Sequence, residues 1–139
     1  MNQFADKVVL ITGGTSGIGA ATVGRMSQLG AHILFTGQRV ERAERILLQT
    51  EHNPGHVVFV PADLSVPQEV KKIVRAAIST FGRLAFAFNN AGTSGPRRLL
   101  AEQSEDVFDD VFAVNVKAVS SSLKVSFGSW WNGAREARL

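Results

Sequence analysis

The clearest candidate for chemistry is a glycine-rich turn that directly follows an apolar run at residues 8–11. Its spacing is Gly-x-x-x-Gly-x-Gly, and residues 20–29 after it have helical character. Glycine lets a backbone turn sharply and approach a ligand closely, while the free amides and the dipole at a helix start attract negative charge. The pattern predicts a pyrophosphate site, although it also suits a tight strand-to-helix connection. The residues of the predicted site are Thr12, Gly13, Thr15, Ser16, Gly17, Ile18 and Gly19.

This turn belongs to a longer pattern in which apolar runs alternate with helical segments. The runs, typical of buried strands, lie at residues 8–11, 31–36, 57–60 and 84–88. Apolar residues with helical spacing follow each run, at residues 20–29, 40–50, 65–81 and from about residue 104. Within this pattern, Ser65 and Gln68 have the spacing of a capping box at the start of the third helix.

Such alternation predicts an α/β fold with a parallel sheet, helices on both faces and right-handed crossovers. The expected strand order is 3-2-1-4. In a doubly wound sheet of this order, ligands bind in the crevice where the order reverses. The glycine turn follows the first strand, so we expect it to lie at that crevice.

Composition excludes several kinds of site. The chain has 139 residues, enough for one domain, and it contains no cysteine, which excludes disulfides, thiolate metal sites and cysteine nucleophiles. The net charge is +3, but the arginines are scattered among acidic residues, so a solvated surface is favoured over nucleic-acid binding. The three histidines lack the spacing of metal ligands. No apolar run reaches the ~20 residues that cross a bilayer, so we expect a cytoplasmic protein without membrane contact.

Four motifs in this order resemble the short-chain dehydrogenases/reductases, a family that transfers a hydride between a nicotinamide dinucleotide and an alcohol or carbonyl. The motifs are the glycine turn from Thr12 to Gly19, Asp63-Leu64 after the third strand, Asn89-Asn90-Ala91-Gly92 after the fourth, and Asn115 in the last helix. The resemblance covers the chain from Asp6 to about Leu123.

The resemblance implies a role for each matching residue. It assigns Asp63 and Leu64 to the adenine, and it makes Asn89-Asn90-Ala91-Gly92 the segment that stabilises the sheet centre and lines the cofactor, with Asn89, Ala91 and Gly92 as cofactor-binding residues. It makes Asn115 an active-site residue that helps to organise a proton relay. Two structural alternatives stay open: Asp63 as a turn residue before Ser65, and Asn115 as a residue that bonds only within the structure.

Residues after the second strand bear on the choice of cofactor. In dinucleotide-binding folds an acidic residue about twenty positions past the glycine turn binds the ribose of NAD, whereas an arginine nearby accommodates the extra phosphate of NADP. Here the second strand is followed by Gly37-Gln38-Arg39, and the first acidic residue is Glu41. We therefore expect NADP(H) to be preferred and NAD(H) to be possible, unless Arg39 is only a solvated helix-start residue.

The resemblance breaks at the catalytic residues. Enzymes of this family carry a serine, a tyrosine and a lysine four positions after the tyrosine, and the tyrosine exchanges the proton with the substrate. This sequence has no tyrosine. Losing a positioned acid or base forfeits about 10²–10⁴ in rate. We therefore expect a catalytically incompetent chain that acts on a small alcohol or carbonyl only if it is completed. The alternative is a non-catalytic dinucleotide-binding or interaction module.

These expectations divide the chain in two. Residues 1–124 would form an incomplete Rossmann-type domain, a doubly wound parallel sheet of four strands with flanking helices. Residues 125–139 show no strand or helix period and are expected to be an irregular tail outside the family. An out-of-frame reading of the family's continuation would explain that tail; a natural short form and a fragment are the alternatives.

Two apolar surfaces would stay open in such a chain. The fourth strand would have one unpaired edge, and the last helix would expose apolar side chains. Because family enzymes commonly pair through this helix, a homo-oligomer or another association through it is expected.

Overall fold

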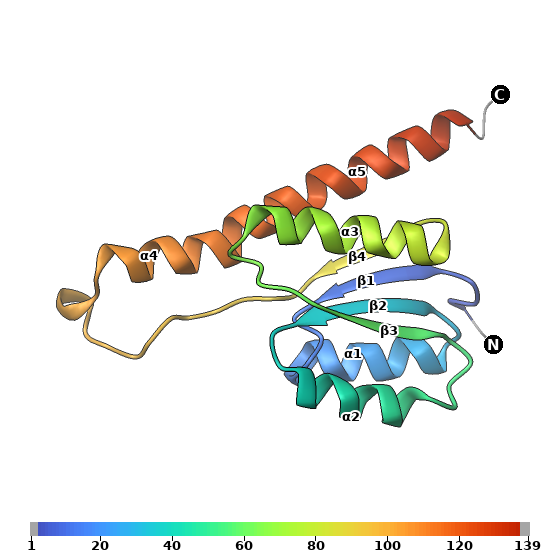
Figure 1. Cartoon of the computed structure of the whole chain (residues 1–139), viewed down its shortest axis with the longest axis horizontal. Coiled ribbons are helices and arrows are strands. Elements are labelled where there is room, and N and C mark those ends of the chain that lie inside the picture. Colours follow the sequence, from blue (N-terminus) through green and yellow to red (C-terminus); the bar gives the residue numbers. More distant parts are fainter. Residues whose placement is uncertain (1–2, 137–139) are drawn as a thin grey trace.

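The computed structural model describes residues 3–136, and the side chains of residues 3–130. Four strands alternate with helices along the chain (Figure 1). The strands are β1 (Val8–Thr12), β2 (His32–Gly37), β3 (Val57–Pro61) and β4 (Phe86–Asn89). The helices are α1 (Gly17–Gln28), α2 (Val40–Thr50), α3 (Pro67–Phe81), the 3₁₀ turn η1 (Leu100–Glu102), α4 (Glu105–Phe112), the π-helical turn η2 (Ala113–Lys117) and α5 (Ala118–Glu136).

The strands form one parallel sheet in the order β3-β2-β1-β4, which confirms the order expected from the sequence. The order reverses between β1 and β4, where Leu10 pairs with Ala87 and Thr12 with Asn89. The carboxyl ends of these two strands carry the glycine turn and the Asn-Asn-Ala-Gly segment. The fold therefore brings the two motifs together at the carboxyl ends of these neighbouring strands.

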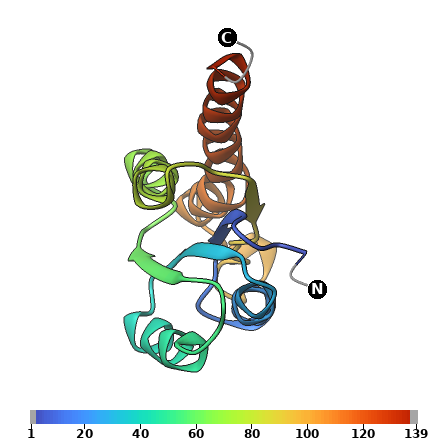
Figure 2. The same ribbon diagram turned by 90° about the vertical axis from the view of Figure 1, so that its right-hand side faces the viewer.

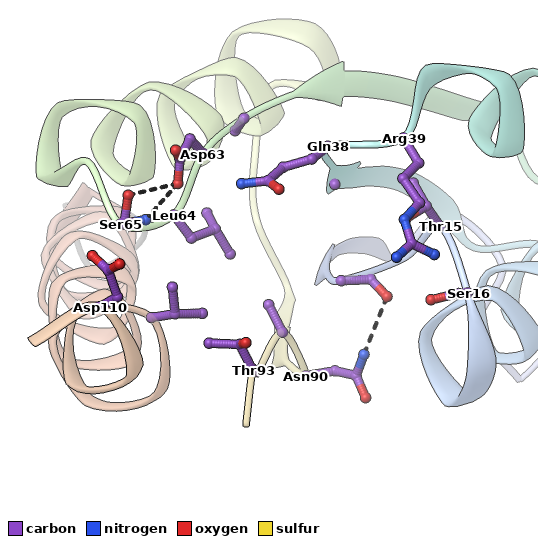
Figure 3. A pocket seen from close by; sticks show the side chains of 16 residues that line it. Thr15, Ser16, Gln38, Arg39, Asp63, Leu64, Ser65, Asn90, Thr93 and Asp110 are labelled. Atoms are coloured by element: carbon purple, nitrogen blue, oxygen red, sulfur yellow. Dashed lines mark hydrogen bonds between the residues drawn. The ribbon is translucent and has the colours of Figure 1, made fainter. Parts of the chain in front are cut away.

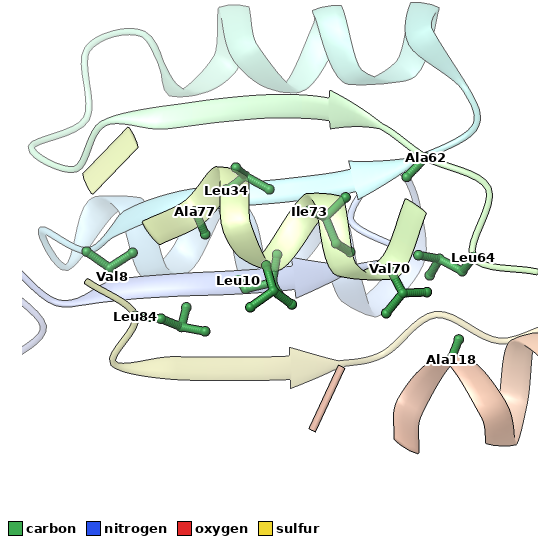
Figure 4. Packing of buried hydrophobic residues seen from close by; sticks show 11 residues of the cluster. Val8, Leu10, Leu34, Ala62, Leu64, Val70, Ile73, Ala77, Leu84 and Ala118 are labelled. Carbon is green, nitrogen blue, oxygen red and sulfur yellow. The ribbon is translucent and has the colours of Figure 1, made fainter. Parts of the chain in front are cut away.

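Alternating side chains of each strand enter one of two apolar layers. In β1, Val9 and Ile11 pack toward α1 and α2, while Val8 and Leu10 pack toward α3 and α5. Figure 2 shows the two helix pairs on opposite faces of the sheet, and Figure 4 shows the α3 and α5 layer around Leu10. Because β1 is buried on both faces, its sequence is continuously apolar rather than alternating.

Helix α3 begins one residue later than the capping-box pattern suggested. Val66 occupies the position before the helix, Pro67 is its first residue, and no side chain caps it. The predicted capping box is therefore wrong: the Ser65 hydroxyl instead donates to Asp63 Oδ1 at 2.7 Å. The other end follows the expectation, because Gly82 adopts φ +79° and ends the helix.

Residues 105–136 form one continuous helical rod made of α4, η2 and α5 (Figure 1). The expected irregular tail is therefore wrong for residues 125–136, while residues 137–139 lie outside the described part of the chain. The sequence hid this helix because its buried face carries small and polar residues. Ala118, Ser122 and Ser126 are buried at a spacing of four, so the face has helical period without apolar period.

Helix α5 is held against the rest of the domain by an aromatic residue. Trp130 is partly buried against the α3 and α5 layer, and its Nε1–H donates to the carbonyl of Leu84 at 2.6 Å. This bond ties α5 to the segment that precedes β4. Among the helices of residues 3–136, none has the length and apolar character needed to cross a bilayer.

Candidate functional site

The glycine turn has a backbone that side chains would obstruct. Gly13 and Gly17 adopt φ +66° and +53°, which L-residues rarely adopt. A Cβ at Gly13 would lie 2.8 Å from Ala91 Cα, and one at Gly19 would collide with the carbonyl oxygen of Gly13. Tight packing therefore restricts positions 13 and 19 to glycine, whereas Gly17 is favoured by its positive φ alone.

The turn leads directly into the amino terminus of α1. This helix begins at Gly17, and the Ser16 side chain before it makes no capping hydrogen bond. The first amides of a helix lack partners within the helix, and their dipole favours an anion. The start of α1 therefore offers amide donors to a phosphate group.

A polar cluster ties the glycine turn to the end of β4. Thr12 Oγ1 accepts hydrogen bonds from the backbone amides of Asn90 and Ala91, at 3.0 and 3.1 Å. Asn90 Nδ2 in turn donates to the carbonyls of Thr12 and Gly13, at 3.2 and 3.3 Å. Thr12 is 4% exposed, so these bonds are held in the interior, where a missing partner would be costly. Thr12 and Asn90 thus position the turn.

Above the glycine turn lies a hollow of about 660 Å³ (Figure 3). It is lined by the carboxyl end of β2, by segments that follow the four strands, and by residues of α4 and η2. The lining residues are Gly13, Thr15, Ser16, Gly37, Gln38, Arg39, Ala62, Asp63, Leu64, Ser65, Asn90, Ala91, Gly92, Thr93, Asp110 and Val114. Its position, outside the carboxyl ends of the strands at the reversal of strand order, is where α/β sheets bind ligands.

The two sides of the hollow differ in charge. On one side Arg39 extends toward Thr15 and Ser16 of the glycine turn; across from it lie Asp63 and Asp110 (Figure 3). An anionic group is therefore favoured on the first side and disfavoured on the second.

Asp63 is held by its own loop. Its Oδ1 accepts the Ser65 hydroxyl at 2.7 Å and the Ser65 amide at 2.9 Å. These two bonds, with a smaller contribution from the Gln38 side chain, lower the pKa of Asp63. Asp63 is thus both a turn residue and an ionised acceptor facing the hollow, so the two alternatives drawn from the sequence are compatible.

Asn115 lies in the π-helical turn η2 and binds the segment that follows β4. Its Oδ1 accepts the Thr93 amide, and its Nδ2 donates to the Thr93 carbonyl, both at 2.8 Å. An amide side chain that pairs both ways with one residue's backbone fixes that residue as a neighbouring strand would. Isolated π turns in helices often occur at functional sites. Asn115 therefore positions Thr93 at the rim of the hollow.

The residues predicted from the sequence fall into two groups. Eight of them line the hollow: Gly13, Thr15, Ser16, Arg39, Asp63, Leu64, Ala91 and Gly92. Thr12, Gly17, Ile18, Gly19, Asn89 and Asn115 are not in its lining. Of these, Thr12 and Asn89 border a small interior space beneath α5.

Eight lining residues were not named singly as site residues: Gly37, Gln38, Ala62, Ser65, Asn90, Thr93, Asp110 and Val114. Of these, Asn90 belongs to the segment that the resemblance assigned to lining the cofactor. Several adjoin predicted residues in the sequence, which is a usable signal. The four-residue spacing of Asp110 and Val114 places them on one face of a helix, but the sequence does not show that this face meets the hollow. A long loop after β4 brings it there. Among the side chains of residues 3–130, no three histidine, aspartate or glutamate side chains gather as ligands of a metal would.

Comparison with known proteins gives one consistent result. The family model described as short chain dehydrogenase matches residues 7–131, beyond residue 124 where the sequence placed the boundary. An uncharacterised oxidoreductase of Staphylococcus saprophyticus is 36% identical over 119 residues, which are 86% of this chain and 47% of the relative. A cyclohexanol dehydrogenase of an Acinetobacter species is 35% identical over 122 residues, 88% of this chain and 49% of the relative.

A solved structure is similar over the same part. A short chain dehydrogenase from Burkholderia cenocepacia, in complex with NADP, superposes with a TM-score of 0.87 at 30% identity and covers 91% of this chain and 52% of that one. The chain thus spans about half the length of the relatives it matches.

Proposed function

Because the chain belongs to the short-chain dehydrogenase family, we propose that its hollow binds a nicotinamide dinucleotide, and NADP(H) in preference to NAD(H). When bound, this cofactor supplies a hydride donor or acceptor for an alcohol or carbonyl. The observation that carries the proposal is the glycine turn. Its positive φ angles, and its tight packing at Gly13 and Gly19 where no Cβ fits, hold the backbone in a shape that a pyrophosphate can approach closely.

The remaining roles follow from where the side chains lie. Arg39 would bind the 2′-phosphate, since a guanidinium binds phosphate through paired donors. Asp63 and Leu64 would hold the adenine on the opposite side. Asn115 would act through Thr93, whose backbone it fixes.

The first prediction concerns cofactor choice. In calorimetric titrations of the chain, we expect NADPH to bind at least about tenfold more tightly than NADH, because only NADPH offers a phosphate to Arg39. Arg39→Ala should remove most of this difference, because it should lower the affinity for NADPH and leave the affinity for NADH unchanged. Arg42→Ala is the matched control, because Arg42 is exposed on α2, which follows Arg39, and lies outside the hollow; it should change neither affinity. Equal NADPH affinity in Arg39→Ala and the parent chain would disprove the role of Arg39.

We further propose that a polypeptide of this sequence binds the cofactor without turnover. The sequence contains no tyrosine to exchange a proton with the substrate. The alternative function, a dinucleotide-binding module that pairs with another chain, shares this property. An assay of carbonyl reduction with NADPH is expected to show no turnover, and measurable turnover would refute incompetence. The cytoplasmic location expected from the sequence stays a prediction.

An exposed apolar stripe along the rod supports the expected association. Five of its side chains are between 36% and 59% exposed: Phe108, Phe112, Val116, Leu123 and Phe127. The amino-terminal end of this stripe is acidic, with Glu105, Asp106 and Asp109, whereas Lys117 and Lys124 lie further along. Antiparallel pairing of two copies would bury both stripes and set acidic ends beside basic ones. We therefore propose a homodimer through α4 and α5.

The second prediction tests this dimer. Sedimentation velocity should show a dimer for the parent chain, and Phe112→Glu should raise its dissociation constant at least about tenfold, because a carboxylate would replace a buried ring. Leu48→Glu on α2, where the side chain is 72% exposed, should leave the dimer intact. A monomeric parent chain, or a Phe112→Glu variant as dimeric as the parent, would exclude this interface.

A further inference from the structure

The side of the hollow that holds Asp63 contains a second acidic residue. The roles proposed above for the glycine turn, Arg39 and Asp63 do not include it. Asp110 comes from α4 and faces the same hollow as Asp63 and Ser65 (Figure 3). It is one helical turn before Val114, which also lines the hollow. The pair therefore presents an apolar side chain and a carboxylate to one region of the site.

Asp63 has limited capacity to bind a ligand. Its Oδ1 already accepts two hydrogen bonds from Ser65, which leaves only part of the carboxylate for a ligand. Asp110 differs, because its carboxylate bonds to no other group within residues 3–130. A carboxylate can accept about four hydrogen bonds, so Asp110 keeps its full capacity for a ligand.

The groups around Asp110 restrict the chemistry of that ligand. Leu64 and Val114 are apolar and suit the faces of a flat ring, while Asp63 and Asp110 exclude a phosphate from this side. A carboxylate accepts hydrogen bonds only, so the edge of the ring must carry N–H donors. A neutral heteroaromatic ring with an exocyclic amine meets all three conditions.

We infer that Asp110 accepts a hydrogen bond from the exocyclic amine of the cofactor's adenine, and that it shares the recognition of this base with Asp63. This inference rests on the proposed function. It makes Asp110 a specificity-determining residue for the base, whereas Arg39 determines the choice between the phosphorylated and unphosphorylated ribose.

The test compares two cofactors that differ at one group. In the hypoxanthine analogue of NADPH a carbonyl oxygen replaces the exocyclic amine, so an acceptor faces Asp110 instead of a donor. Calorimetry should give the parent chain about a tenfold preference for NADPH over the analogue. In Asp110→Asn the side chain can donate to the carbonyl oxygen, and the preference should fall to about threefold or less.

The control is Asp109→Asn, the neighbouring exposed carboxylate of α4, which does not line the hollow and should keep the parent preference. Circular dichroism should show all three proteins folded. An unchanged preference in Asp110→Asn, or an equal loss in Asp109→Asn, would overturn the inference while leaving the proposed function in place. A parent chain that binds neither dinucleotide would overturn the proposed function and this inference together.

Discussion

Gly19→Ala is expected to weaken dinucleotide binding by at least about 100-fold. The new Cβ would collide with the carbonyl oxygen of Gly13 and would lie 2.7 Å from Asn90 Nδ2. The carbonyl oxygen of Gly13 belongs to the backbone and cannot rotate away, so the glycine turn would have to move away from the start of α1. The amides of α1 and the turn would then no longer converge on one phosphate. Calorimetry with NADPH measures the loss, a change of about 2.7 kcal/mol.

The control for this prediction lies on the same helix. An added Cβ at Gly24 would meet nothing within 4 Å, so Gly24→Ala should leave binding unchanged and stabilise the fold by about 1 kcal/mol through helix propensity. Thermal unfolding of both variants separates a lost site from a lost fold. Parent-like affinity in Gly19→Ala would show that the pyrophosphate does not depend on this turn.

Phe35→Ala should lower the free energy of unfolding by about 3–5 kcal/mol. The Phe35 ring is 0% exposed and lies 5.1 Å from the ring of Phe59, between centroids. It also supports the site, since a Cβ on Gly14 would come within 2.8 Å of its side chain. Domains of this size are stable by about 5–15 kcal/mol, so the loss is a large fraction of the total.

Urea unfolding measures this loss, and an unchanged m-value would show that the folded state stays compact. Leu48→Ala is the matched control, because that side chain is 72% exposed and its removal should cost less than about 0.5 kcal/mol. A loss below about 1.5 kcal/mol for Phe35→Ala would contradict the packing described beneath the glycine turn.

The sheet could be predicted from sequence because its strands are buried on both faces. Runs such as residues 8–11 are continuously apolar, and glycines or prolines punctuate the segments between them. Alternation of strands and helices then restricts the connections to right-handed crossovers, which gave the strand order. These signals are local, so one sequence was enough.

The candidate site was harder to predict where a single residue of register decides the outcome. Asn89 and Asn90 are adjacent at the end of β4, and only Asn90 reaches the glycine turn. Since successive strand side chains point to opposite faces, the choice depends on the exact pairing with β1. Asp110 was missed for another reason: it reaches the hollow only through the path of the loop between β4 and α4.

The final helix shows a third kind of error. Helix α5 packs through Ser122 and Ser126, which are buried without apolar character. Small side chains let the helix approach α3 and β4 closely, and this benefit depends on the partner surface rather than on the helix sequence. Apolar periodicity therefore could not reveal it.

A crystal structure of the chain soaked with NADPH is the most direct test of the central claim, which is that a pyrophosphate lies on the amides at the start of α1. Electron density should place both phosphates against residues 13–19, with the adenine between Leu64 and Val114. An ordered dinucleotide bound elsewhere, with the amides of α1 left to solvent, would contradict the account.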